Sequence, residues 1–391
     1  MDSIKELYKI GYGPSSSHTM GPQRAASIFL KKNPQASKFI VELYGSLSLT
    51  GKGHLTDYII KETLGKDRTE VIFDNTTTYD YHPNALKLKA YNNDKLLDEW
   101  LVFSVGGGDL MELNEKRDVS KVSVYPHSNM NEILKYCKDE KISLVQYVKR
   151  FDDVSSYLEE VLQTMFSTIE IGLVKRGTLP GSLNLKRKAN DFYLKYLENK
   201  SFSNFLYASS LATAEENASA GLVVTAPTCG SSGVLPAVLY TSMKHYNTHH
   251  QILIDALMVA GLIGNIIKYN GSISGAEVGC QGEIGSACSM AAAAYSVILN
   301  STNEQIEYAS EIALEHNLGL TCDPVDGLVQ IPCIERNALA SAKAIDAANY
   351  ASLTDGNHHI SFDNVITVMK ETGKDLNLKY RETSIGGLAK K

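Results

Sequence analysis

Hydrophobic residues follow two different spacings along this chain, and the change between them divides it into two parts. In the first third, short segments rich in β-branched and aromatic residues indicate strands over 39–44, 70–74 and 100–105. A helix is expected over 23–32, where apolar residues recur at helical spacing and Pro34 follows the last turn. This mixture predicts a small domain that contains both strands and helices.

From residue 129 onward, apolar residues recur every three or four positions, which is the spacing of amphipathic helices. The clearest case runs from Leu158 to Leu173. Further helices are expected over the ranges 212–222, 252–267, 287–299, 305–316 and 335–352. The apolar stretch 252–267 contains Asp255 and Asn265 and is short for a membrane span, so we expect a buried helix.

A glycine run at 106–108 and a charged stretch at 112–121 separate the two patterns and indicate a domain boundary. We therefore expect an α+β N-terminal domain over 1–125, followed by a mainly α-helical domain over 126–391. The chain shows neither an internal repeat nor a low-complexity tract.

The composition restricts the partners that such a protein can have. The 391 residues include 38 basic and 44 acidic ones, giving a net charge of −6 without an extended basic run. We therefore expect no nucleic-acid partner and no membrane partner. The first residues lack the apolar core of a signal peptide. Six cysteines without a secretion signal indicate reduced thiols in the cytoplasm, where metal ligation is favoured over disulfides.

Three of these cysteines lie beside glycine or proline in the second part of the chain. Cys280 lies within the glycine-rich segment 275–285, and Cys322 and Cys333 bracket a turn. Three soft ligands without a fourth nearby favour an iron–sulfur cluster with one iron open to a ligand. An open iron is a Lewis acid, so the pattern indicates catalysis rather than electron transfer.

Glycine-rich, proline-containing loops precede several of the expected helices. They lie at 225–233, 270–275 and 321–324. Such loops offer backbone N–H groups to an anion at a helix N-terminus. Their nearness to the cysteines in the sequence predicts that they share one binding site with them.

Three motifs in the first domain carry candidate chemistry. The segment 13–22 places serines, a histidine and a threonine ahead of a helix, which suits a carboxylate receptor, although an N-cap alone would need one serine. The segment 50–54 holds a lysine and a histidine between glycines, so it is either a close-approach loop or an exposed turn. In the segment 82–84, proline fixes the backbone after a histidine.

Taken together, these segments resemble the single-chain, iron–sulfur L-serine dehydratases of bacteria, also called L-serine ammonia-lyases. The matching segments run nearly from end to end: 13–22, 48–54, 82–84, 104–108, 179–187, 224–228, 275–290, 322–339 and 379–384. In two-subunit relatives, the chain divides just before a segment like 125–133, in agreement with a boundary near residue 125.

The resemblance implies that Cys280, Cys322 and Cys333 hold a 4Fe-4S cluster, without pyridoxal phosphate, and that the helical domain is catalytic. It also implies conversion of L-serine to pyruvate and ammonia by β-elimination of water, with serine bound to the open iron. We expect His54 to remove the Cα proton and His18 to orient the carboxylate, although the two roles could be exchanged. The remaining residues expected to bind substrate are Ser15, Ser16, Ser17, Thr19, Lys52, His82 and Asn84.

Other functions compete with this one. A lyase acting on threonine or cysteine would use the same chemistry, because these substrates differ little in volume. A serine-binding sensor with a structural or lost cluster is a second alternative. A pyridoxal-phosphate eliminase fits poorly, because Lys52 has no phosphate-binding loop beside it. A homodimer is the default expectation for an enzyme of this kind.

Two departures from the family pattern carry expectations of their own. Many single-chain members continue past a segment like 386–389 to a cysteine that is thought to cap the open iron. Since this sequence ends at Lys391, we expect no such cap and faster oxidative loss of the cluster. Cys229 stands where relatives commonly have asparagine, and we expect it to be a buried free thiol, as Cys137 and Cys288 are.

Overall fold

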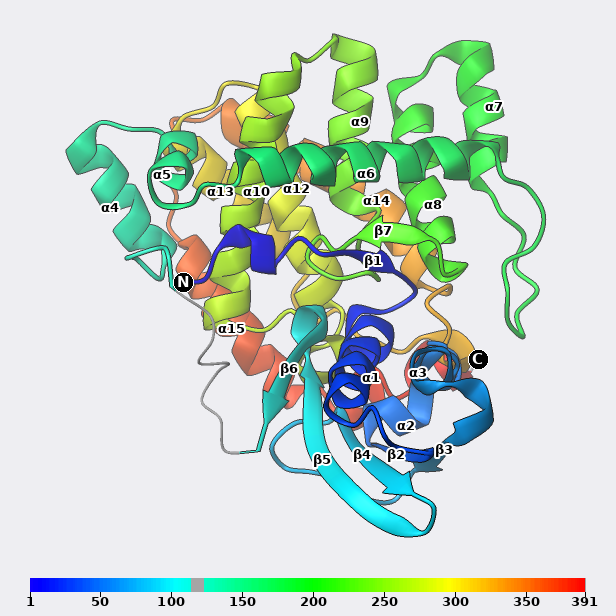
Figure 1. The fold of residues 1–391 in the computed structure, drawn as a ribbon. Helices are drawn as coiled ribbons and strands as arrows, with labels where there is room; N and C mark the ends of the chain where they lie inside the picture. The colour runs from blue at the N-terminus through cyan, green and yellow to red at the C-terminus, as the bar shows by residue number, and fades with distance from the viewer. Residues whose placement is uncertain (114–122, 391) are drawn as a thin grey trace.

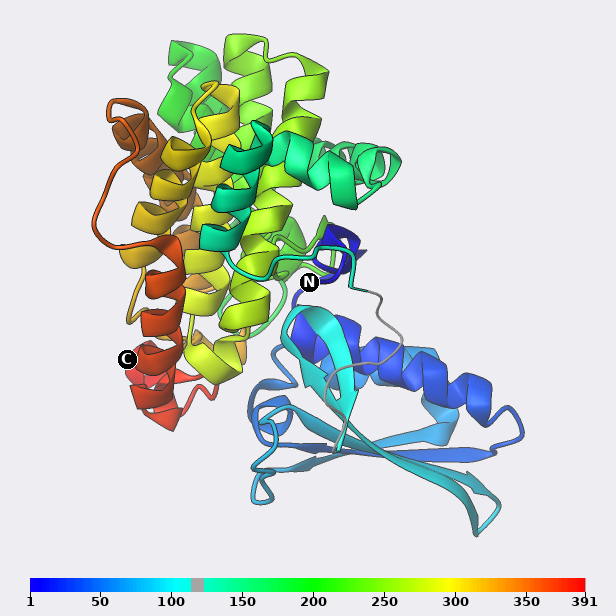
Figure 2. The ribbon, with the colours of Figure 1, turned by 90° about the vertical axis from the view of Figure 1, so that its left-hand side faces the viewer.

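The computed structural model describes residues 1–113 and 123–390. It consists of a sheet-containing part and a larger helical body, which Figures 1 and 2 show from two directions. The first part is a mixed sheet with helices and the second is mainly helical, which confirms the expected fold class. Most of the charged stretch 112–121 lies outside the described residues, and the boundary near residue 125 stays a prediction.

The sheet of the first part has five strands in the order β3-β2-β4-β5-β6. Its strands are β2 (Lys38–Tyr44), β3 (Thr69–Asp74), β4 (Ala85–Asn92), β5 (Lys95–Val105) and β6 (Asp109–Glu112). β2 and β3 pair in parallel and the other neighbours are antiparallel. The three predicted strands are confirmed as β2, β3 and β5. β4 and β6 were not predicted, although Leu86, Leu88 and Ala90 alternate with lysines in β4.

Two helices cover one face of this sheet, α1 (Gly21–Lys32) and α3 (Thr56–Leu64), with the short α2 (Ser46–Thr50) at its end (Figure 2). Phe29 of α1 and Ile60 of α3 are fully buried in a core shared with β2 and β4. The predicted helix at 23–32 is confirmed as α1, whose last turn ends before Pro34.

The second part is built from twelve α-helices in the described residues. They are α4 (Met130–Glu140), α5 (Leu144–Phe151), α6 (Ser155–Val174), α7 (Ala189–Asn199), α8 (Phe202–Ala218), α9 (Val234–Tyr246), α10 (His250–Asn270), α11 (Gly275–Val278), α12 (Ser286–Ile298), α13 (Asn303–Glu315), α14 (Cys333–Ser352) and α15 (Phe362–Asp375). α10 and α12 lie at the centre, where small and branched side chains are fully buried. α10 is long and apolar enough to span a membrane, but 78% of its most apolar window is buried in the protein.

The helix expected over 212–222 is wrong at both ends, since α8 already begins at Phe202. α8 stops at Ala218, and Leu222 begins the short strand β7 (Leu222–Val224). The break occurs at Ala220, whose φ of 56° lies in the left-handed region, and at Gly221, whose N–H returns to the Glu216 carbonyl.

The N-terminal residues belong to the helical body before the chain enters the sheet. Strand β1 (Ile10–Tyr12) pairs antiparallel with β7, and Leu7 and Tyr8 are buried in the helical core. Figure 1 shows this first segment in blue, running along the helices and then turning down into α1. The residues that follow β1 therefore lie between the two parts of the molecule.

Candidate active site

The three cysteines singled out by the sequence come together in the helical body. Cys280 follows Gly279, whose φ is 74°, and precedes the helical turn Gln281–Gly285. Cys333 is the first residue of α14, where the helix dipole favours negative charge. Cys322 lies between α13 and α14 and contributes to the same cavity as the other two.

This cavity is small, about 20 Å³, so the groups around it are in close contact. Residues from both parts of the molecule line it beside the cysteines: Pro14, Ser15, His54, Gly230, Glu283, Ile284, Pro324, Val329 and Glu382. Two of the three glycine-rich loops thus reach the cavity wall. The third passes close to it, because a Cβ on Gly275 would lie 3.1 Å from Cys322 Sγ.

The first domain reaches the cavity because the two parts pack face to face. Ser46 Oγ donates to the Glu382 carbonyl at 2.7 Å, and Asn217 Nδ2 donates to the Pro14 carbonyl at 2.8 Å. A Cβ on Gly53 would lie 2.5 Å from the Gly327 carbonyl oxygen. That approach holds the loop of residues 50–54 directly against the cysteine side of the site.

The three thiols differ in their readiness to ionise. A hydrogen bond from Cys322, supported by the Arg336 guanidinium, lowers the pKa of Cys280 to about 6 against the opposing effect of burial. The same hydrogen bond and burial raise the pKa of Cys322. Burial, with the nearby charge of Cys280, raises the pKa of Cys333. Cys280 is therefore the thiolate of the set, and the thiolate is the form that binds metal.

Two carboxyl groups, the half-buried Glu283 and the buried Glu382, face the thiols. Glu283 Oε2 lies 3.9 Å from Cys322 Sγ, and burial followed by the charge of Cys280 raises the pKa of Glu283 to about 8. Glu382 is 4% exposed, and its N–H donates to the Cys322 carbonyl at 2.7 Å. Its φ of 56° is a left-handed conformation that costs energy for a residue other than glycine and is concentrated at functional sites.

His18 and His54 form a buried pair, with ring centroids 4.4 Å apart. Each is held by a threonine from the other's segment. Thr19 Oγ1 donates to the His54 carbonyl at 2.7 Å, and Thr56 Oγ1 donates to the His18 carbonyl at 2.6 Å. Burial lowers the pKa of His54 to about 4, and burial with the charge of His54 lowers that of His18. Both rings are therefore neutral at physiological pH.

Hydrogen bonds assign the tautomers of both rings. His54 Nδ1 lies 3.0 Å from the Thr50 carbonyl, which can only accept, so this nitrogen carries the proton and Nε2 the lone pair. The Ser46 hydroxyl donates its proton to the Glu382 carbonyl. Its oxygen therefore accepts a hydrogen bond from His18 Nε2, which lies 3.1 Å away. The lone pair of His18 is then on Nδ1, 3.0 Å from Ser17 Oγ.

The two nitrogens that carry these lone pairs lie near the same carboxyl oxygen. Glu382 Oε1 lies 3.5 Å from His18 Nδ1 and 3.8 Å from His54 Nε2. Burial, followed by the charges of Glu283 and Cys280, raises the pKa of Glu382 well above its usual range. A protonated Glu382 faces two nitrogens that can only accept, but His18 Nδ1 already accepts from Ser17 Oγ, so His54 Nε2 is the nitrogen with which Glu382 can exchange a proton.

The predicted hydroxyl run serves mainly to hold the histidines. Of these residues, Ser15 lines the cavity, and its Oγ also accepts from the His18 N–H at 3.1 Å. Ser16, Ser17 and Thr19 are buried in the helical turn Ser16–Met20, where Ser17 and Thr19 bind the histidines as described above.

Lys52 is not brought to the cavity. It is exposed, and its Nζ lies 5.4 Å from the centroid of the Phe73 ring, a cation–π contact on the outer side of the loop. The short loop turns His54 inward, and the lysine two residues earlier consequently faces solvent.

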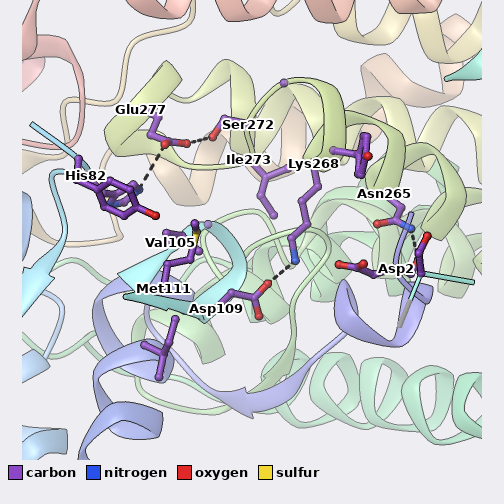
Figure 3. Close-up of a pocket in the computed structure, with 16 residues that line it drawn as sticks. Asp2, His82, Val105, Asp109, Met111, Asn265, Lys268, Ser272, Ile273 and Glu277 are labelled. Atoms are coloured by element: carbon purple, nitrogen blue, oxygen red, sulfur yellow. Dashed lines mark hydrogen bonds and ion pairs between the residues drawn. The ribbon is translucent and has the colours of Figure 1, made fainter. Parts of the chain in front are cut away.

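His82 and Asn84 lie apart from the cysteine cavity. His82 lines a second cavity of about 660 Å³ between the two parts of the molecule, which Figure 3 shows in close-up. Its Nε2 lies 3.5 Å from Glu277, which in turn binds Ser272 (Figure 3). Asn84 is fully buried, and neither polar atom of its side chain has a hydrogen-bond partner among the described residues.

Four residues at or beside this cavity were not predicted from the sequence: Ser46, Glu283, Arg336 and Glu382. Glu283 had a signal, since a carboxylate inside the glycine-rich segment 275–285 has few ways to be solvated. Arg336, three residues after Cys333, and Glu382, inside the segment 379–384, lie in segments that match the family, but neither was singled out. Ser46 belongs to the site through tertiary packing alone.

The residues present fit an iron–sulfur cluster in their donor chemistry. Cys280, Cys322 and Cys333 are soft ligands that meet at one cavity, and Gly230 and Gly275 leave the adjoining wall without side chains. Among the described residues, no group of histidine, cysteine and carboxylate side chains has the spacing needed to hold a single metal ion. Each thiolate around a cluster binds a different iron, so a wider arrangement is expected for it.

Three thiols, two carboxyl groups and a neutral histidine around one cavity define an enzyme site for metal-assisted acid–base chemistry. Comparisons with known proteins specify it further. Residues 98–389 match the serine dehydratase alpha chain family, and residues 3–66 match the serine dehydratase beta chain family.

Full-length relatives agree with these matches. The chain is 41% identical to L-serine dehydratase of Haemophilus influenzae and 40% identical to L-serine dehydratase 1 of Escherichia coli, covering 100% of this chain and 99% of each relative. It is 37% identical to L-serine dehydratase of Helicobacter pylori strain 26695, over 99% of this chain and 98% of the relative. The chain therefore belongs to the iron–sulfur L-serine dehydratase family, with its beta and alpha parts joined in one polypeptide.

Proposed function

We propose that this protein converts L-serine to pyruvate and ammonia by β-elimination of water. The observation that carries the proposal is the lone pair of His54 Nε2, which belongs to a neutral ring in the wall of the cavity that the three cysteines line. The family membership and the named activity of the full-length relatives support the same reaction.

Elimination requires a base for the weakly acidic Cα proton and assistance for the departing hydroxide. A 4Fe-4S cluster held by Cys280, Cys322 and Cys333 would supply, when bound, a Lewis acid that polarises the serine hydroxyl. The low pKa of Cys280 favours the thiolate that such ligation needs.

His54 provides the base. Its Nδ1–H is fixed on the Thr50 carbonyl, so the ring can accept the Cα proton at Nε2 without turning. The imidazolium that results lies 3.8 Å from Glu382 Oε1. Glu382, which lines the same cavity, gives its proton to the departing hydroxide, and the carboxylate that remains stabilises the new charge. A positioned general base typically contributes about 10²–10⁴-fold to the rate. Loss of water leaves an aminoacrylate, which tautomerises to an imine and hydrolyses to pyruvate and ammonia.

His18 acts through its neighbours in this proposal. Both of its ring nitrogens already bind serine hydroxyls, and it does not line the cavity. We therefore assign it to positioning His54 and Glu382, and we assign the Ser15 hydroxyl to the substrate carboxylate. This revises the carboxylate role that the sequence suggested for His18.

The proposal is tested by pyruvate release from L-serine, using protein reconstituted with iron and sulfide without oxygen and then exposed to air. We expect turnover that disappears together with the cluster absorbance. A fully loaded protein that releases no pyruvate would contradict the proposal and favour the serine-binding sensor.

Threonine and cysteine are tested as substrates in the same assay. Each differs from serine by a methyl group or a sulfur atom, so discrimination in a closely packed cavity is expected to be modest. The expected homodimer is tested by measuring the mass of the protein in solution.

A further inference from the structure

Arg336 lies one helical turn after Cys333 on α14, where residues three apart share a face of the helix. Its guanidinium donates to the Cys280 sulfur and also, through Nη1, to the Thr321 carbonyl at 2.6 Å. Thr321 immediately precedes Cys322. One side chain thus connects the three segments that supply the three thiols.

The groups that surround the cavity can carry several negative charges, so losing the positive charge of Arg336 beside Cys280 is expected to be costly. Cys280, Cys322, Cys333, Glu283 and Glu382 bring five potential negative charges to one buried cavity. The described wall of that cavity contains neither lysine nor arginine. Arg336 is half-buried and contacts the thiol without lining the cavity, so its charge faces the sulfur ligands and not the substrate space.

The chemistry of the side chain explains why arginine occupies this position. A guanidinium is planar and offers N–H groups in fixed directions, so it can meet a sulfur and a carbonyl oxygen at once. A lysine could supply the charge but would concentrate it on a single ammonium group.

We propose that Arg336 is a positioning residue that holds the three cysteine segments in register and donates a charged hydrogen bond to the cluster ligand Cys280. This inference rests on the cluster part of the proposed function. Outer-shell partners of metal ligands typically change metal affinity by about 10- to 100-fold when they are removed. Hydrogen bonds to cysteine sulfur also raise the reduction potential of a cluster.

The test compares the unaltered protein with Arg336→Gln and Arg336→Lys after anaerobic reconstitution. We measure iron retained after gel filtration, the lifetime of the cluster absorbance in air, and the reduction potential of the cluster. Arg336→Gln should hold the cluster about 10- to 100-fold more weakly and shift its potential to a more negative value. Arg336→Lys should recover most of the potential and less of the retention.

Lys343→Gln is the matched control, because Lys343 lies on the same helix and donates to the His316 carbonyl, away from the three ligands. It should leave all three quantities unchanged. Thermal unfolding of each variant before reconstitution establishes that it is folded.

The outcomes separate this inference from the proposed function. If Arg336→Gln retains iron, lifetime and potential indistinguishable from those of the unaltered protein, the role of Arg336 is refuted while the reaction stands. If the unaltered protein takes up a cluster but releases no pyruvate, the reaction fails and the role of Arg336 is still measurable. Failure of the unaltered protein to take up any cluster would refute both.

Discussion

The two parts of the molecule supply different chemistry to one cavity and hold it in different ways. Cys280 and Cys322 belong to the continuous buried core of the helical body. The sheet domain has a separate core of its own, and His18 and His54 are buried in turns outside its strands and α-helices. The thiols are thus part of the packing that folds the helical body, whereas the histidines lie on turns at an interface.

Polar contacts, not apolar packing, place the histidines. Two threonine bonds join their segments within the first domain, and the bond from Ser46 to the Glu382 carbonyl connects that domain to the helical body. This difference implies that cluster retention and proton transfer are separable properties. The cysteine side should keep its cluster when the histidine side is damaged, but the reverse should not hold.

The largest effect is expected from Cys280→Ser. Replacing the thiolate with a hydroxyl removes a soft ligand, so the variant should retain little iron and release no measurable pyruvate. Iron content and pyruvate release check this expectation. The control is Cys288→Ser, since Cys288 is fully buried and contacts the Ala340 carbonyl outside the cavity. Equal loss of iron in both variants would mean that general destabilisation, and not ligation, is responsible.

His54→Gln should separate the two sides of the site. Loss of the base is expected to lower kcat by about 10²–10⁴-fold while iron content stays at the level of the unaltered protein. Steady-state kinetics and iron analysis measure the two quantities on one sample. His250→Gln serves as the control, because His250 is exposed and pairs with Glu159 on the surface. Full turnover by His54→Gln would remove this histidine from the mechanism.

Gly53→Ala tests whether the contact between Gly53 and Gly327 positions His54 in the cavity. The added Cβ would lie 2.5 Å from the Gly327 carbonyl oxygen, a backbone atom that cannot move aside easily. Displacing a catalytic group by about 1 Å can cost on the order of 10²-fold, so kcat/KM should fall by up to that factor with the cluster retained.

The matched control for Gly53→Ala is Gly177→Ala. Gly177 has a φ of 101° and open space around its Cβ position, so alanine there is strained but meets no neighbour. A comparable loss of kcat/KM in both variants would show that general destabilisation by replacing a glycine, rather than displacement of the loop, explains the effect.

Features that depend on a local sequence pattern could be predicted, whereas features that depend on contacts between distant segments could not. The cysteines could be predicted because soft ligands close to glycine or proline have a local signature, and the regular elements could be predicted because periodicity is local. The position of Glu382 at the cavity could not be predicted from the sequence. This residue reaches the cavity because the chain returns beside Cys322 and forms an isolated bridge there, and that return is set by tertiary packing.

Lys52 shows the opposite error. Its place between two glycines next to a histidine indicated a binding loop, and the loop does line the site through His54. Alternate residues of so short a turn face opposite ways, and the sequence does not say which one faces inward. The contact with Phe73, a residue on strand β3, fixes the outcome.

The smallest expected effect concerns stability and pH. Burial lowers the pKa of His54 from 6.5 to about 4 in the folded protein, whereas the unfolded chain keeps the ordinary value. Between these values the unfolded state binds a proton that the folded state excludes, so the free energy of unfolding falls as pH falls. The change attributable to this residue is on the order of 3 kcal/mol. Urea unfolding across that pH interval should show a shallower decline for His54→Gln than for the unaltered protein. Parallel declines in the two proteins would mean that the ring already carries its proton when folded, and a charged His54 could not act as the base.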